Sequence, residues 1–385
     1  MKSIINFFYC NLLIILATVG YLLGGYWLWL GLGVILVVPF FGDWLLPEYI
    51  EGQDAKYNVF YNLSLYLNFP LLIVANFVLA WLLSSSDPFS FGHIVITTFG
   101  YDLFAVRDSC QTIDYVLAMV GMGYLYGIAG TNISHELAHR QWSAPAQHMS
   151  RLLSAFTADG AFPVEHVYGH HRRVATYDDP ATARRGESSW QFVWRSTIQS
   201  FRNAMAFETK RLKKKGCFPY SLKNRVIQGN LFFILYFLFY LYMAGFLGGA
   251  ALILMSVYGK MQLELINYIE HYGIVRVPGE PVLPRHSWNS NHYISIFLLY
   301  NLPRHSHHHE TGHLPFWKLN SYSEAPHLPY GYLTMILLAM VPPLFQRVMI
   351  PEVNKWDEHY ATEGELALAK QANERSGYTL FSKSS

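Results

Sequence analysis

Charged residues are scarce in this chain of 385 residues, at 14% of the total. Soluble domains average about 25%, and 52% of the residues here are hydrophobic. This composition excludes an intrinsically disordered chain and a coiled coil. The mean hydropathy is only +0.17, so the chain does not lie in a membrane throughout. The composition favours a membrane-embedded part joined to a polar part.

Cysteine is also scarce, and its three positions, Cys10, Cys110 and Cys217, lie far apart without a CxxC pair. A disulfide framework and a zinc ribbon are therefore excluded. The net charge of +2 gives no reason to expect a nucleic-acid partner. Histidine is the residue present in excess, with 17 copies, and most of the functional argument depends on where these fall.

Apolar runs of about 20 residues predict membrane-spanning helices, because a hydrocarbon core of about 30 Å needs about 20 residues at 1.5 Å each. Gly24-Gly25 and Gly248-Gly249 predict tight turns within the first and last pairs of runs. The apolar stretch 92–104 predicts an interfacial or re-entrant piece, and 363–374 predicts a short helix. We expect spans near residues 7–23, 27–46, 69–85, 112–134, 229–246 and 248–269.

The polar block 135–228 indicates the orientation of the chain. It contains 15 Lys and Arg residues against seven Asp and Glu residues, and basic segments favour the cytoplasmic side. We therefore predict an all-α protein of about six spans in a bacterial inner membrane, with both termini in the cytoplasm. It would form one functional domain with these parts: spans 1–4 in 1–134, a cytoplasmic segment in 135–228, spans 5–6 in 229–269, a cytoplasmic or interfacial segment in 270–350, and a polar tail in 351–385.

A basic run at 210–215 within this block has two interpretations. It is a topology signal of the kind just described, or it steers an acidic electron carrier to the protein. We favour the topology signal.

Histidines are grouped in four clusters. The i, i+4 spacing of His135 and His139 places both imidazoles on one face of a helix, where they can bind one ion. The same spacing predicts that His166 and His170 share an ion, while His171 turns about 100° away towards a neighbouring ion. The clusters are HELAH at 135–139, EHVYGHH at 165–171, NYIEHYG at 267–273 and RHSHHH at 304–309.

Eight histidines in three of these clusters are too many for one ion and suit two. Neutral imidazole binds Fe, Zn, Cu and Ni. Every cluster lies at, or just beyond, the predicted cytoplasmic end of a span, so all four are expected to meet beneath the membrane. The HELAH string also matches the zinc protease motif, but a single zinc site leaves the other clusters unexplained.

The sequence resembles the integral-membrane alkane hydroxylase and xylene monooxygenase family of non-haem di-iron oxygenases. The resemblance covers about residues 40–360 and has the four clusters in the family's order. The strings NYIEHYG and RHSWNSN, the latter at 285–291, distinguish this family from fatty acid desaturases, which share shorter histidine motifs. His307 stands where alkane hydroxylases usually have Asp, and a histidine at this position is closer to the pattern of xylene-type enzymes.

The resemblance implies two iron ions held by nine histidines: His135, His139, His166, His170, His171, His271, His305, His308 and His309. No catalytic residue is expected beyond these ligands. Carboxylates beside the clusters are expected to accept the second N–H of a ligating imidazole, and nearby amides to orient ligands or line the site: Glu136, Glu165, Asp179, Glu270, Asn267, Asn289 and Asn291.

The implied activity is hydroxylation of a methyl C–H bond by O2, on an alkane or an alkyl-aromatic such as xylene or toluene. The substrate would reach the ions between helices from the bilayer. Electrons would come from NAD(P)H through rubredoxin or a ferredoxin-type reductase. Two alternatives remain: a histidine-box desaturase or related lipid-oxidising enzyme, and a metal transporter, which would hold its ligands near the bilayer midplane.

Overall fold

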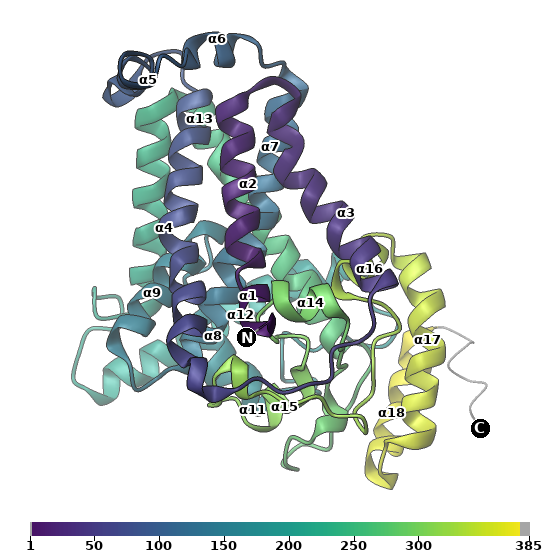
Figure 1. Cartoon of the computed structure of the whole chain (residues 1–385). Helices are drawn as coiled ribbons and strands as arrows, with labels where there is room; N and C mark the ends of the chain where they lie inside the picture. The colour runs from purple at the N-terminus through teal and green to yellow at the C-terminus, as the bar shows by residue number, and fades with distance from the viewer. Residues whose placement is uncertain (1, 378–385) are drawn as a thin grey trace.

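The computed structural model describes residues 2–377, and within this part the chain is all-α. Apolar helices run side by side in the upper half of Figure 1, while most of the other helices and the loops form the lower half. The only pairing of extended segments in the described residues is an isolated bridge between Asn289 and His327. The predicted fold class is therefore confirmed.

The first elements, in chain order, are α1 (Lys2–Asn6), α2 (Tyr9–Leu23), η1 (Gly25–Trp29), α3 (Leu30–Leu45), η2 (Ala55–Tyr57), α4 (Asn58–Leu82), η3 (Pro88–Ser90), α5 (Phe91–Phe99), α6 (Leu103–Asp108), α7 (Thr112–Leu125), η4 (Tyr126–Thr131), α8 (Asn132–His139) and α9 (Ala144–Ser154). They are followed by η5 (Ala155–Thr157), α10 (Phe162–Glu165), η6 (His166–His170), α11 (His171–Arg173), α12 (Ser189–Lys214), α13 (Arg225–His271), η7 (Pro284–His286), α14 (Tyr293–Leu298), α15 (His305–Glu310), η8 (Phe316–Lys318), α16 (Tyr332–Ala339), α17 (Pro342–His359) and α18 (Glu363–Ser376).

Among residues 2–377, four helices are long and apolar enough to cross a membrane: Gly25–Leu45, Ala55–Leu82, Thr112–His139 and Arg225–His271. The apolar helix α2 is shorter, at 15 residues. The fourth of these helices contains a reversal, so six helical segments correspond to the six predicted runs. That all six cross a membrane stays a prediction.

The two predicted turns have different outcomes. The chain reverses between α2 and η1 at Gly24, whose φ of +73° favours glycine, so the first turn is confirmed. In α13 the non-helical residues are Ala244 and Gly245. The chain therefore turns four residues before Gly248-Gly249, and the position predicted for the second turn was wrong. The two later glycines instead allow close contact within the hairpin, because a Cβ at Gly248 would lie 2.3 Å from the Tyr240 carbonyl oxygen.

Helix α4 begins at Asn58, well before the predicted start of its span at residue 69. Its first half contains polar side chains that lower the hydropathy, yet these are used inside the protein. Asn68, for example, is buried and donates hydrogen bonds to the Ser64 carbonyl and the Tyr300 hydroxyl. The stretch 92–104 forms parts of α5 and α6, which lie across the end of the bundle farthest from the histidines (Figure 1).

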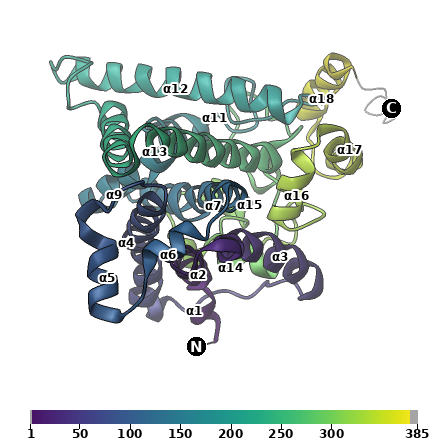
Figure 2. The ribbon, with the colours of Figure 1, turned by 90° about the horizontal axis from the view of Figure 1, so that it is seen from above.

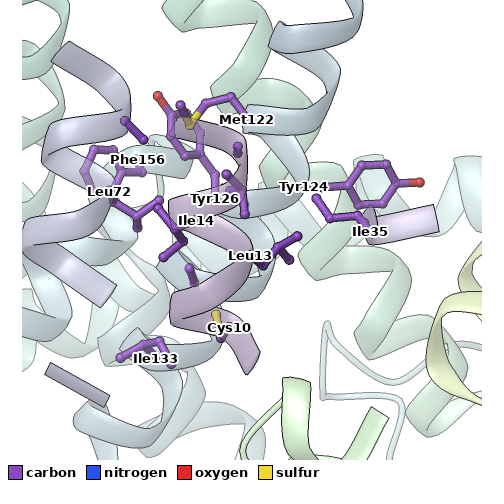
Figure 3. Close-up of a cluster of buried hydrophobic side chains, with 14 of the residues drawn as sticks. Cys10, Leu13, Ile14, Ile35, Leu72, Met122, Tyr124, Tyr126, Ile133 and Phe156 are labelled. Carbon is purple, nitrogen blue, oxygen red and sulfur yellow. The ribbon is translucent and has the colours of Figure 1, made fainter. Parts of the chain in front are cut away.

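The apolar core joins helices that are far apart in the sequence. Figure 3 shows side chains of α2, α3, α4 and α7 meeting in one buried cluster, which includes Leu13, Ile35, Leu72 and Met122. A second core lies between the end of α13 and helices α16–α18. The lower half also depends on buried ion pairs such as Arg185–Asp357, 2.6 Å apart. The predicted helix near 363–374 is confirmed as α18.

Candidate metal centre

Nine imidazoles converge in the lower half of the molecule. They come from α8, η6, α11, the last residue of α13, and α15, and all are buried or nearly so. They are the nine histidines that the sequence predicts as ligands: His135, His139, His166, His170, His171, His271, His305, His308 and His309.

The imidazoles form two groups, each with its nearest nitrogens within 4.8 Å of one another. The first group contains five imidazoles: His135, His139, His166, His171 and His308. The second contains four: His170, His271, His305 and His309. The two groups adjoin, with the rings of His171 and His309 stacked at 4.4 Å between centroids.

The distribution between groups corrects one expectation. The prediction paired His166 with His170, but His166 lies with His171, their Nε2 atoms 3.1 Å apart, and His170 belongs to the other group. The cause is local backbone geometry, because η6 is a π-helix. In a π-helix the bonds run from i to i+5, so the residue five positions on returns to the same side. The i, i+4 pair His135 and His139 does share a group, as predicted.

The donor chemistry of both groups fits metal ions. One imidazole nitrogen can make one in-plane hydrogen bond, yet Nε2 of His166 lies 3.0 Å from that of His139 and 3.1 Å from that of His171. Nε2 of the buried His135 has no hydrogen-bond partner at all. A shared cation satisfies all these nitrogens, since two nitrogens bound at about 2.1 Å and at right angles are about 3.0 Å apart.

Burial keeps most of these imidazoles in the neutral form that binds metals. It lowers the pKa of His166, His171, His305, His308 and His309 well below the ordinary value, and the neighbouring imidazoles lower it further. His170 is the exception. Burial lowers its pKa, but the carboxylate of Asp179 more than offsets this, and the pKa is raised.

Two carboxylates touch the second group. Asp179 Oδ2 lies 2.8 Å from His170 Nδ1, the ring nitrogen that faces away from the group, and it also accepts a 2.6 Å bond from the Thr182 hydroxyl. Glu270 differs, because its Oε2 lies 3.3 Å from His305 Nε2, the nitrogen that faces the group. The Tyr332 hydroxyl donates to the other oxygen of Glu270 at 2.9 Å. Sequence reasoning assigned no role to Thr182 or Tyr332.

The other two predicted carboxylates bind arginines instead of histidines. Arg140 donates to Glu136 at 2.9 Å, one helical turn along α8. Arg173 donates to Glu165 at 2.8 Å, and burial, followed by the nearby charge of Asp179, raises the pKa of Glu165 to about 7. These arginines are four and eight residues away from their acids, and sequence alone could not decide whether each acid contacts an arginine or a histidine.

The predicted amides occupy different places. Asn267 lines a cavity together with His135, His166 and His305, as expected of a residue at the site. Asn289 makes backbone hydrogen bonds to Pro326 and Leu328, and the carbonyl oxygen of Asn291 accepts from the Tyr49 amide. His307 turns away from both groups, because its Nδ1 accepts from the Asn320 amide and its ring stacks on Tyr322.

Three cavities run in a row from the histidines to the outer face of the bundle, and the walls of the two outer ones are mostly apolar. The inner cavity, about 20 Å³, is lined by His135, His166 and His305 and shares Gly127 and Ile266 with a middle cavity of about 40 Å³. The middle cavity shares Ile35, Pro39 and Leu298 with an outer cavity of about 380 Å³ between α2, α3 and α14. Leu12 on the outer cavity is half exposed, so the row ends at the surface that would face lipid.

Known proteins share this sequence over most of its length. Residues 113–339 match the family model "Fatty acid desaturase". The chain is 38% identical to alkane 1-monooxygenase of Acinetobacter baylyi over 66% of its own length, and it spans 62% of that relative. It is 30% identical to the xylene/toluene monooxygenase hydroxylase component XylM of Pseudomonas putida, over 95% of this chain and 93% of the relative. Alkane 1-monooxygenase of Pseudomonas putida is 32% identical over 85% of this chain and 77% of the relative.

Proposed function

The chain belongs to the family of membrane alkane and xylene monooxygenases, and from this premise we propose that it hydroxylates a methyl group of a hydrocarbon dissolved in the bilayer. The observation that carries the proposal is the position of the two histidine groups at the blind end of an apolar row of cavities. A soluble substrate would need polar groups there, and the walls of the two outer cavities are almost wholly apolar.

The nine histidines would hold two iron ions, five imidazoles on one and four on the other. Bound iron supplies the activation of O2 and the oxidation of an unactivated C–H bond, which no side chain of the cavity can perform. The remaining work belongs to the protein: binding the substrate, excluding water and supplying protons. In balance, the methyl compound, O2, two electrons and two protons give the alcohol and water.

Glu270 is the residue placed to handle a proton. Its Oε2 faces the second histidine group, while its other oxygen accepts from Tyr332. Both side chains are buried, so a proton held on Glu270 Oε2 would be shielded from bulk water. We assign Glu270 the delivery of a proton to the oxygen that leaves as water.

The substrate would enter from the lipid between α2 and α3 and pass Leu298 to Ile266, with its methyl group beside His135, His166 and His305. Water is excluded along this path by the apolar walls, which favours oxidation of the bound substrate over loss of oxidant to solvent. Both a linear alkane and a methyl-substituted aromatic are apolar molecules with a methyl group, so both suit this route. His307, which lies outside the groups, gives no contact that selects between them.

We further propose that both termini and the histidine groups lie in the cytoplasm, at a bacterial inner membrane. The excess of Lys and Arg in 135–228 supports this orientation. Electrons would then come from NAD(P)H through rubredoxin or a ferredoxin-type reductase on the same side. A metal transporter is disfavoured, because all nine histidines lie at or beyond one end of the long helices.

The test is product analysis under 18O2. Membranes containing this chain and a matching reductase are supplied with octane or m-xylene, and we expect 1-octanol or 3-methylbenzyl alcohol carrying one 18O atom. An alkene without 18O would show that the protein desaturates its substrate instead of hydroxylating it. No product with either substrate, from a protein that carries iron, would overturn the proposal.

A further inference from the structure

Helix α12 has an apolar stripe that no part of the described chain covers. Its inner face, with Phe192 and Ala204, packs against α13 and α10. At 100° per residue, four large apolar side chains fall within about 80° on a different face. They are Trp190, Trp194, Ile198 and Phe201, with exposed fractions of 43%, 72%, 46% and 46%.

The helix lies at the depth where the long helices end. Viewed from above, α12 is seen lengthwise along the outer edge of the molecule, beside α13 (Figure 2). It contacts α13 at Arg225, which bonds to Glu208, and at Glu264, which bonds to Thr197. Both contact points are about 19 residues from the turn at Gly245, or about 29 Å along a helix. This is about the thickness of a hydrocarbon core, so α12 lies at a membrane surface.

The stripe faces the side of the long helices and not the cytoplasm. On α12, Thr197 lies next to the stripe and bonds to Glu264 of α13. Phe192, on the inner face, contacts Tyr268 of α13. Because Glu264 is one helical turn nearer the bilayer than Tyr268, the stripe lies on the bilayer side of α12. On the opposite edge, Arg195 donates to the carbonyl oxygens of Pro180 and Thr182 in the loop below.

The stripe also continues an apolar surface. Leu254 and Val257, about three and two turns above Glu264 on α13, are 62% and 63% exposed. In a membrane these side chains face acyl chains, so lipid that covers them extends to the stripe of α12.

The carboxyl end of α12 is basic. Lys213, Lys214 and Lys215 are exposed there, and the next segment presents three more large apolar side chains, Phe218, Tyr220 and Leu222, each at least 65% exposed. Aromatic residues beside lysines are typical of segments that lie in the headgroup region of an anionic membrane. An acidic electron carrier would match the lysines, but it would leave the apolar stripe uncovered at membrane depth.

We propose that α12 and residues 213–222 form an interfacial lipid-binding surface that prefers anionic phospholipids in the leaflet on the histidine side. The inner face of this helix packs against α10 and η6, the π-helix that contributes His166 to one histidine group and His170 to the other. Lipid on the outer face therefore holds in place a helix that supports both groups.

Depth measurements on the full chain in lipid nanodiscs test the stripe. Cys110 and Cys217 are replaced by Ser, and a nitroxide is attached through F201C or, as the matched control, Q199C. The two positions lie about 160° apart on the helix. We expect the label at 201 to be relaxed mainly by O2 and the label at 199 mainly by an aqueous nickel chelate. Equal exposure of both labels to the chelate, in protein with unchanged iron content, would overturn the proposal.

Lipid selectivity tests the lysines. A bimane on native Cys217, in a C110S background, is placed in nanodiscs with spin-labelled phosphatidylglycerol or phosphatidylcholine at the same mole fraction. We expect severalfold stronger quenching by the anionic lipid, and loss of that preference in K213Q/K214Q/K215Q. Equal quenching in the parent chain would overturn the anionic preference. If the labels at 201 and 217 were shielded from water only after an acidic electron-transfer protein is added, this surface would be a protein interface instead.

Discussion

The two histidine groups adjoin, yet they differ in what surrounds them. The first group has five imidazoles, and no carboxylate contact to it is found among the described residues. The second has four imidazoles together with Asp179 on an outer ring nitrogen and Glu270 on the inner side. Negative charge near a ligand raises its basicity and stabilises a cation. The comparison therefore predicts two ions of unequal charge environment, with proton handling confined to the second.

The sharpest test uses two neighbouring residues of α15 that belong to different groups, His308 and His309. H308A and H309A should each lower iron from about two to about one per chain and reduce turnover at least 100-fold, because each removes one ligand of one ion. Metal analysis of purified protein and 18O2 assays measure both effects. H307A, which removes a ring outside both groups, should keep two irons; loss of both irons in each single variant would mean that the groups are not separate sites.

The next largest effect is expected at Glu270. E270Q should lower kcat about 100-fold or more, as expected for a lost proton donor, while iron content stays near that of the parent. Y332F removes the hydroxyl that donates to Glu270 and should give a smaller loss. If E270Q instead loses one iron, Glu270 acts as a ligand of the second group and the proton assignment fails.

Asp179 should affect affinity more than turnover. D179N weakens the acceptor for His170 Nδ1, and changes of this kind typically cost about 10- to 100-fold in metal affinity. A chelator titration should show one iron released earlier than in the parent and the other unchanged. Equal weakening of both ions would contradict the asymmetry between the groups.

Much of this arrangement could be predicted from the sequence, because spacing and hydropathy are local properties. The all-α fold and the four histidine clusters follow from them, and the turn at Gly24 follows from its glycine pair. The full set of nine histidines follows from the family resemblance. The division of His166, His170 and His171 between groups did not, since it depends on a π-turn that no residue type specifies. The partners of Glu136 and Glu165 also depend on tertiary contacts with arginines. The early start of α4 was missed because its polar side chains are satisfied by distant residues.

Both groups border the same inner cavity, so blocking the row of cavities should lower turnover without disturbing either iron. L298W fills the junction between the outer and middle cavities and should reduce kcat/KM about tenfold or more for octane and m-xylene, through lost substrate access. V37W is the matched control, because Val37 lies on α3 beside residues that line the outer cavity, is 54% exposed and lines none of the three cavities. Unchanged kcat/KM in L298W with full iron content would place the substrate route elsewhere.

The smallest effect is expected at Glu208, where a substitution should change the stability of the fold without acting on one histidine group more than on the other. Glu208 is buried in α12, which opposes its ionisation, but Arg211 and Arg225 hydrogen-bond its carboxylate and lower its pKa to about 2. A carboxyl with a folded pKa below its unfolded value of about 4.5 stabilises the protein fully above that value, and this is lost as the pH falls towards 2. E208Q should therefore lower the melting temperature by a few degrees at pH 7 and flatten its decline between pH 4.5 and 2. E352Q, which removes the partly exposed i, i+3 partner of the exposed Lys355, should do neither. Since α12 packs against η6, which contributes one histidine to each group, any iron that E208Q loses at pH 7 should come from both groups equally. A loss from one group alone would show that the groups are supported independently.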